Sequence, residues 1–131
     1  MLYSAPLCAP LAFAREPALR YLSGMPFQPL LVYCTCPDHD TALRIAKSLV
    51  DQQLAACVNV VPGLTSVYRW EGQPEMAQEV LLLIKTRQEV YPELEAALLA
   101  LHPYELPEII AVPIEAGLPA YLSWIETGTG A

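Results

Sequence analysis

Apolar and polar residues alternate near residue 30, and this pattern predicts the first strand of the chain. Residues 30–36 (LLVYCTC) place two cysteines on the same side as a leucine and a valine, until Pro37 ends the run. Asp38 and Asp40 then offer N-caps to a helix of about four turns. Its apolar positions recur at helical spacing: Ala42, Ile45, Ala46, Leu49 and Val50.

The next two apolar stretches predict a long antiparallel hairpin. Residues 57–70 (CVNVVPGLTSVYRW) form a β segment that contains Pro62-Gly63, which favours a bulge or bend. Residues 71–75 have turn composition, and residues 79–86 (EVLLLIKT) form the following strand. Val80, Leu82 and Ile84 point to one side of this strand and Leu81 and Leu83 to the other, so both of its faces are apolar.

The C-terminal half predicts a helix, a strand and a final short helix. The helix covers about residues 88–101, with Pro92 in its first turn and Pro103 ending it. Its apolar face consists of Val90, Leu94, Ala97, Leu98 and Leu101. A strand follows at about residues 108–114, and residues 116–126 form a short helix or helical turn.

This order of elements predicts an α+β, ferredoxin-like βαββαβ fold with a four-stranded antiparallel sheet. Right-handed crossovers place both main helices on one face, and the short C-terminal helix is added to this core. Since both sheet faces are apolar, the second face must meet another subunit or the terminal helix. Each exposed aliphatic side chain would otherwise cost about 1.5–3 kcal/mol, so we expect oligomers.

The 131 residues predict one domain at 27–127, between two segments of different character. Residues 1–26, which are interrupted by Pro6, Pro10 and Pro17, are interpreted as an N-terminal extension outside the core, and Met25 as the biological start. Residues 128–131 are expected to form a flexible tail.

Charge and cysteine content narrow the class of protein. The net charge of −7 argues against nucleic-acid and anionic-membrane partners, which require basic patches. No apolar stretch is long enough to span a bilayer. The four cysteines lack the spacing of a disulfide framework, so we interpret them as reduced thiols and expect a cytoplasmic protein.

Four motifs, taken together in their order, resemble the CutA family of divalent-cation tolerance proteins. They are AACVN (55–59), SVYRWEG (66–72), KT (85–86) and HPYELPEI (102–109), and the resemblance covers about residues 30–125. It implies a ferredoxin-like, PII-like subunit in a tight homotrimer whose edge strands pair between subunits. It also implies copper binding and a role in the response to metal ions, with no catalysed reaction.

The first candidate site is the pair Cys34 and Cys36. Alternate residues of a strand share a face, and two soft thiolates suit copper(I). The resemblance links the Cys34 position to copper, whereas many relatives lack a thiol at the position of Cys36. The alternative is that both cysteines pack as small core residues.

His102 is the second candidate metal ligand. It lies at a predicted helix C-terminus, where it could ligate a metal or cap the helix. Some relatives carry two adjacent histidines here, whereas this chain has Leu101-His102.

The third candidate is a polar and aromatic cleft between subunits, for a small anionic or metal ligand. Its expected members are Tyr68, Trp70, Glu79, Lys85, Tyr104 and Glu105. Lys85 ends an apolar strand, so we expect it to pair with Glu79 or Glu105, either within the chain or across a subunit boundary. The alternative is a structural ion pair among interface aromatics.

These observations favour a non-enzymatic homotrimer that binds a divalent metal, copper above all, or a small ligand. One alternative is an enzyme that uses Lys85 and Glu105 as acid–base groups. Another is a PII-like scaffold for an unknown protein partner. No catalytic triad, phosphate-binding loop or helical His-Glu motif supports an enzyme.

Overall fold

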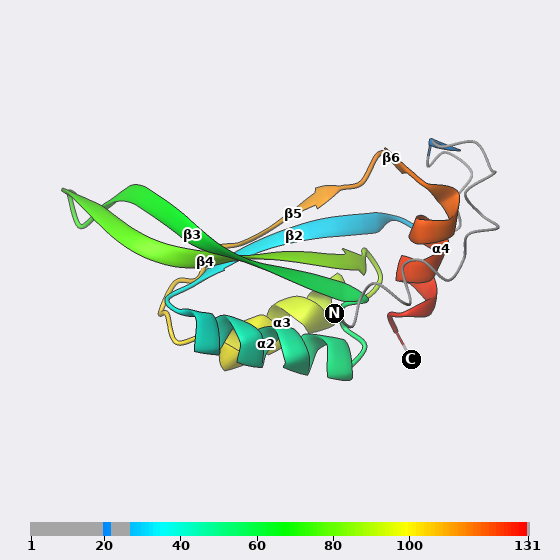
Figure 1. Ribbon diagram of the computed structural model, residues 1–131, viewed down its shortest axis with the longest axis horizontal. Coiled ribbons are helices and arrows are strands. Elements are labelled where there is room, and N and C mark those ends of the chain that lie inside the picture. The colour runs from blue at the N-terminus through cyan, green and yellow to red at the C-terminus, as the bar shows by residue number, and fades with distance from the viewer. Residues whose placement is uncertain (1–19, 22–26, 131) are drawn as a thin grey trace.

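The computed structural model describes residues 20–21 and 27–130, and its main element is a four-stranded antiparallel sheet with helices α2 and α3 on one face (Figure 1). The strands are β1 (Arg20–Tyr21), β2 (Pro29–Cys36), β3 (Cys57–Trp70), β4 (Gln73–Arg87), β5 (Ile109–Pro113) and β6 (Ala116–Gly117). The helices are α2 (His39–Asp51), α3 (Tyr91–Leu101) and α4 (Pro119–Thr127).

The sheet order β3-β4-β2-β5 confirms the predicted ferredoxin-like fold. The first strand of the motif, β2, lies in the middle and pairs with β4 on one side and β5 on the other. Strands β3 and β5 are therefore the edges. The β3–β4 hairpin extends well beyond the helices at one end of the molecule, and α4 lies at the other end (Figure 1).

The hairpin has the predicted irregularity and a tighter turn than predicted. Its register shifts between Val61 and Leu64, on either side of Pro62-Gly63. The turn consists of Glu71 and Gly72 alone, with φ of 51° and 82°, so the expected turn at 71–75 is too long. Two positive φ values fit a two-residue hairpin turn of the type that matches strand twist. Residues 73–75 instead belong to β4.

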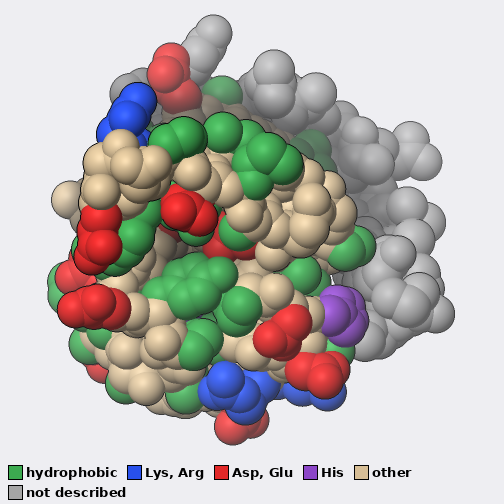
Figure 2. Space-filling model, turned by 90° about the vertical axis from the view of Figure 1, so that its left-hand side faces the viewer, with side chains coloured by type: hydrophobic (Ala, Val, Ile, Leu, Met, Phe, Trp, Pro, Cys, Tyr) green, Lys and Arg blue, Asp and Glu red, His purple; other side chains and the backbone are tan. Residues whose placement is uncertain are grey.

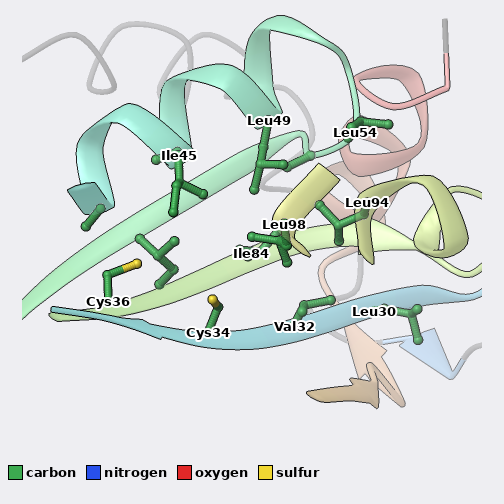
Figure 3. Packing of buried hydrophobic residues seen from close by; sticks show 14 of the residues in the cluster. Leu30, Val32, Cys34, Cys36, Ile45, Leu49, Leu54, Ile84, Leu94 and Leu98 are labelled. Carbon is green, nitrogen blue, oxygen red and sulfur yellow. The ribbon is translucent and has the colours of Figure 1, made fainter. Parts of the chain in front are cut away.

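The core lies between the sheet and the two helices (Figure 3). From β2, residues Leu30, Val32, Cys34 and Cys36 point to the helices, as strand alternation predicts. From the helices, the most deeply buried residues are Ile45, Leu49, Leu94 and Leu98. Val50, which we expected on the apolar stripe of α2, is 43% exposed because it lies one residue past Leu49 and faces away from the sheet.

Helix α2 begins where the sequence predicts. Asp38 is the N-cap, and its carboxylate accepts a hydrogen bond of 2.8 Å from the Thr41 amide. This bond lowers the pKa of Asp38, because it stabilises the charged form. The aspartate therefore satisfies one of the amides left free at a helix start.

Helix α4 forms a second small core with Phe27, and the residues after it pack on the sheet end. Leu122 and Ile125 are buried against Phe27. Thr129 belongs to the segment expected to be a flexible tail, yet it is 4% exposed. The Arg87 side chain donates to its hydroxyl at 2.9 Å and to its carbonyl oxygen at 3.0 Å. Residues 128–130 are thus held by the end of β4.

Two residues of the N-terminal segment are described. Arg20–Tyr21 form β1, which pairs antiparallel with Ala116–Gly117 of β6. The rest of the predicted extension, Met25 included, lies outside the described residues, as does Ala131. Among the described residues, no helix is both long and apolar enough to cross a membrane.

Candidate functional site

The three predicted metal ligands lie together on the helix side of β2. The candidate ligand atoms of Cys34, Cys36 and His102 lie within 4.8 Å of one another, and all three residues are buried. The two thiols come from alternate positions of one strand, and the histidine follows the last residue of α3. We call these residues the thiol–histidine cluster. The sequence predicted its members, but their proximity depends on how α3 packs on the sheet.

His102 already has partners on both ring nitrogens. Its Nε2 lies 2.7 Å from the carbonyl oxygen of Thr35, and its Nδ1 lies 3.1 Å from the backbone nitrogen of Tyr104. A carbonyl only accepts and an amide only donates, so Nε2 carries the proton and Nδ1 is the acceptor. The imidazole therefore joins β2 to the segment after α3, and a metal ion would have to replace one of these two bonds.

The two thiols have opposite shifts in pKa. The pKa of Cys34 is raised strongly, because its thiol donates a hydrogen bond to Cys36 and is buried away from water. The pKa of Cys36 is lowered by the same hydrogen bond, which stabilises its thiolate. Both residues are 0% exposed and also belong to the hydrophobic core. The core interpretation of these cysteines is thus compatible with the metal interpretation.

The predicted cleft residues border a cavity of about 900 Å³ at the end of the molecule where the hairpin projects. Figure 2 looks onto this end and shows a hollow bordered by acidic and hydrophobic side chains. Five predicted members line the cavity: Tyr68, Trp70, Glu79, Tyr104 and Glu105. Other lining residues were not predicted, among them Thr35, Ser66, Glu75 and Glu108. We call this space the acidic cavity.

The acidic cavity is organised around the carboxylate of Glu79. One of its oxygens accepts from the Ser66 hydroxyl at 2.6 Å, and the other accepts from the Tyr104 hydroxyl at 2.7 Å. Burial, and then the bond to Glu79, raises the pKa of Tyr104. This phenol therefore remains a proton donor to the carboxylate. Ser66 could have been found from its motif, since it stands two residues before Tyr68 in SVYRWEG.

Within one chain, Lys85 does not line this cavity. Its ammonium donates to the side-chain oxygen of Asn59 and lies 3.9 Å from the sulfur of Cys57. Cys57 is its cross-strand partner in the β3–β4 register. In the described chain, Lys85 therefore pairs with neither Glu79 nor Glu105 of the same subunit, and pairing across a subunit boundary stays a prediction.

Comparison with known proteins identifies the family. A profile of the family "CutA1 divalent ion tolerance protein" matches residues 30–128, most of the chain. The chain belongs to the CutA family. The match spans both the thiol–histidine cluster and the acidic cavity.

Similar proteins extend this result. The chain is 51% identical to the divalent-cation tolerance protein CutA of Thermus thermophilus over 100 residues, which are 76% of this chain and 97% of that protein. The solved structure of a divalent cation tolerance protein from Thermus thermophilus superposes with a TM-score of 0.77 at 50% identity, over 78% of this chain and 99% of that one. The similarity includes a chloroplastic CutA protein of Arabidopsis thaliana, at 45% identity over 76% of this chain.

The extent of the match differs between relatives. The chain spans nearly all of the Thermus protein but only 55% of the Arabidopsis protein. The names of the two Thermus matches describe tolerance of divalent cations.

Proposed function

We propose that this CutA-family chain binds copper as Cu(I) through Cys34 and Cys36, and that it contributes to tolerance of this metal. The observation that supports this proposal most is the proximity of two thiols and an imidazole within 4.8 Å. Soft sulfur ligands favour Cu(I) over hard divalent cations, and imidazole is a good third ligand for copper.

The chemistry of the cluster determines how the metal would bind. Metal ions bind thiolates, so the Cys34 thiol must lose the proton that burial and Cys36 hold on it. Binding then releases protons, and the affinity rises with pH. His102 joins the ligand set only if it gives up one of its two hydrogen bonds, to the Thr35 carbonyl oxygen or from the Tyr104 amide. The two sulfurs are therefore the primary ligands in this proposal, and His102 is the third.

Titration of the reduced protein with Cu(I), in competition with a chromophoric chelator, tests this assignment. We expect Cys34→Ser and Cys36→Ser each to weaken binding by at least about tenfold, because each removes one of two thiolate ligands. His102→Gln should weaken it less. The matched control is Cys57→Ser, which removes a thiol outside the cluster and should leave the affinity unchanged. Equal binding by wild type and Cys34→Ser would refute the proposal.

We further propose that the protein is a homotrimer. Both edge strands carry exposed aliphatic residues, with Val61 on β3 at 39% exposure and Ile110 on β5 at 54%. Exposed edges of this kind pair readily with other chains. Sedimentation equilibrium should give three times the 14.4 kDa mass of the chain. Ile110→Lys should reduce that mass, whereas a wild-type mass of one chain would contradict the trimer.

We also propose that the protein is located in the cytoplasm, which is a reducing compartment. Cys34, Cys36 and Cys57 are all free thiols in the part of the chain that the structure describes. Cu(I) ligation by thiolates requires that they stay reduced. Cell fractionation followed by thiol labelling should find the protein in the cytoplasmic fraction with these cysteines reduced. Recovery in an oxidising compartment would contradict this location.

A further inference from the structure

The sheet face away from α2 and α3, which we call the outer face, carries an acid toward one end and a lysine toward the other. Residues 79, 81, 83 and 85 of β4 alternate with the buried residues that point to the helices, so they share the outer face. Glu79 lines the acidic cavity at the hairpin end. Lys85 lies two residues before the other end of the strand, and the hairpin and α4 lie at opposite ends of the molecule (Figure 1).

These two charges cannot meet within one chain. Six residues of extended strand separate them, which corresponds to about 20 Å at roughly 3.3 Å per residue. The ammonium of Lys85 donates instead to the side-chain oxygen of Asn59. Among the described residues it has no carboxylate partner, because the one ion pair there joins Arg87 to Glu89.

Glu79 also lacks a cation in its own chain. It is only 9% exposed, and its two hydrogen bonds come from the neutral hydroxyl groups of Ser66 and Tyr104. A carboxylate can accept about four hydrogen bonds, so acceptor positions remain. The cavity lining adds three more glutamates and no lysine, arginine or histidine. Since a buried carboxylate is costly without a cation, its cation has to come from outside the chain.

The outer face between the two charges fits a second copy of the chain better than a small ion. Leu81 and Leu83 separate the charges on β4. On β5, Ile110 and Val112 share this face and are 54% and 43% exposed. A small cation would leave this aliphatic surface in water, whereas a second copy would cover it.

Lys85 is the cation that the sheet offers to such a copy. The cations of the four-stranded sheet, in the part of the chain that the structure describes, are Arg69, Lys85 and Arg87. Arg69 donates to the Gly72 carbonyl oxygen in the hairpin, and Arg87 donates twice to Thr129. A contact between the Lys85 end of one chain and the cavity of the next is heterologous, and three such contacts can close a ring.

We propose that Lys85 of the partner subunit enters the acidic cavity and pairs there with Glu79. This inference rests on the homotrimer proposed above and names a contact that holds it together. The ammonium group exchanges the amide oxygen of Asn59 for a buried carboxylate. Glu105, which is exposed in the same lining, adds to the negative field that attracts it. The acidic cavity is thus a joint between subunits, complete only in the assembled ring.

A double-mutant cycle on subunit association tests this pair. Sedimentation equilibrium measures the dissociation constant of the trimer, at a urea concentration that partly dissociates the wild type. We expect Lys85→Gln and Glu79→Gln, which keep the shapes of the side chains, each to weaken association by at least about tenfold, because each leaves the other charge unpaired. The double variant should be no weaker than either single variant, since all three lack the same contact.

Two controls accompany the cycle. Lys47→Gln removes an exposed cation from α2 and should change association by less than about twofold. Lys85→Gln should keep the wild-type affinity for Cu(I), because Lys85 lies on the opposite face of the sheet from Cys34 and Cys36. Retained Cu(I) binding shows that the loss of association in this variant is not caused by unfolding.

Two results would overturn the Lys85–Glu79 contact. The first is a double variant whose loss is the product of the two single losses, as expected for residues that do not touch. The second is a loss in Lys85→Gln no larger than in Lys47→Gln. A wild type that sediments as one chain would refute the trimer itself, whereas either of these results in a wild-type trimer would refute this contact alone.

Discussion

At the scale of single residues, His102 combines structural and chemical roles. Its two hydrogen bonds join β2 to the segment after α3, and the same ring lies beside two buried thiols. The sequence offered capping and ligation as alternatives for this histidine. The geometry is compatible with both the structural role and metal ligation, because both ring nitrogens are hydrogen-bonded and the ring also lies near the two sulfurs.

Tyr121 gives the chain a measurable dependence of stability on alkaline pH. Burial, followed by the nearby Cys57, raises the pKa of Tyr121 to about 12 from an ordinary 10.0. A phenol whose pKa is raised on folding stabilises the native state below pH 10, and this contribution is lost as the pH rises toward 12.

We therefore expect the free energy of unfolding to fall across that interval in wild type and to fall less in Tyr121→Phe. Urea unfolding at several alkaline pH values measures the difference, and phenolate absorbance reports the titration. Parallel losses in the two proteins would show that Tyr121 is not the responsible group.

Leu98 and its neighbour Leu99 offer a matched test of the core on α3. Leu98 is 0% exposed and packs between the helices and the sheet, whereas Leu99 is 56% exposed. Leu98→Ala should lower the free energy of unfolding by about 2–5 kcal/mol, because it leaves a cavity. Leu99→Ala should change it by only about 0.5 kcal/mol. Similar values for the two variants, measured by denaturant unfolding, would contradict the described orientation of α3.

At the scale of elements, the ends of strands and helices differ most from what the sequence indicated. Pro62-Gly63 signalled the hairpin irregularity correctly, since proline and glycine have known backbone consequences. The turn was predicted too long because Gln73 and Pro74 also have turn composition. Strand β2 pairs with β4 only as far as Val80, so residues 73–79 of β4 have β3 as their one neighbouring strand. Pro74 is tolerated there because it lies at an open edge of the sheet.

Hydrogen bonds of the C-terminal residues connect α4 to the end of β4. The Thr129 hydroxyl receives the Arg87 guanidinium and donates to the Ile125 carbonyl oxygen at 2.9 Å. Thr129→Val keeps the shape of the side chain and removes both bonds, so we expect a loss of about 1–3 kcal/mol.

Thr127→Val is the control, because the Thr127 hydroxyl bonds the Trp124 carbonyl oxygen on the exposed side of α4. It should have little effect on thermal unfolding. Hydrogen exchange of the Gly130 amide, which donates to Gln53, should accelerate only in the Thr129 variant. Unchanged exchange there would indicate that the tail is held by other contacts.

At the scale of the whole molecule, periodicity was sufficient to predict the order and topology of the four-stranded sheet and its helices, but not the short pair β1 and β6, whose residues 116–117 were expected in the terminal helix. The cavity and the partner of Lys85 were not predictable in the same way. They depend on the β3–β4 register, which brings Cys57 opposite Lys85 and Leu64 opposite Glu79 across the bulge. A side chain such as Thr35 has no motif that marks it, and only the assembled sheet shows that its hydroxyl borders a cavity.

Two opposite faces of the sheet thus carry two different chemistries. The helix side holds two buried thiols and a histidine, and the other side holds carboxylates and aromatic rings around a cavity. Membership in a family named for divalent-cation tolerance is consistent with a metal on the first face.

X-ray absorption spectroscopy of the copper-loaded, reduced protein tests the central claim most directly. The account predicts Cu(I) with sulfur neighbours in its first shell. These neighbours should be lost in the Cys34→Ser/Cys36→Ser double variant and retained in Cys57→Ser. A first shell of nitrogen and oxygen alone, or sulfur neighbours that persist in the double variant, would contradict the thiol–histidine cluster as the copper site.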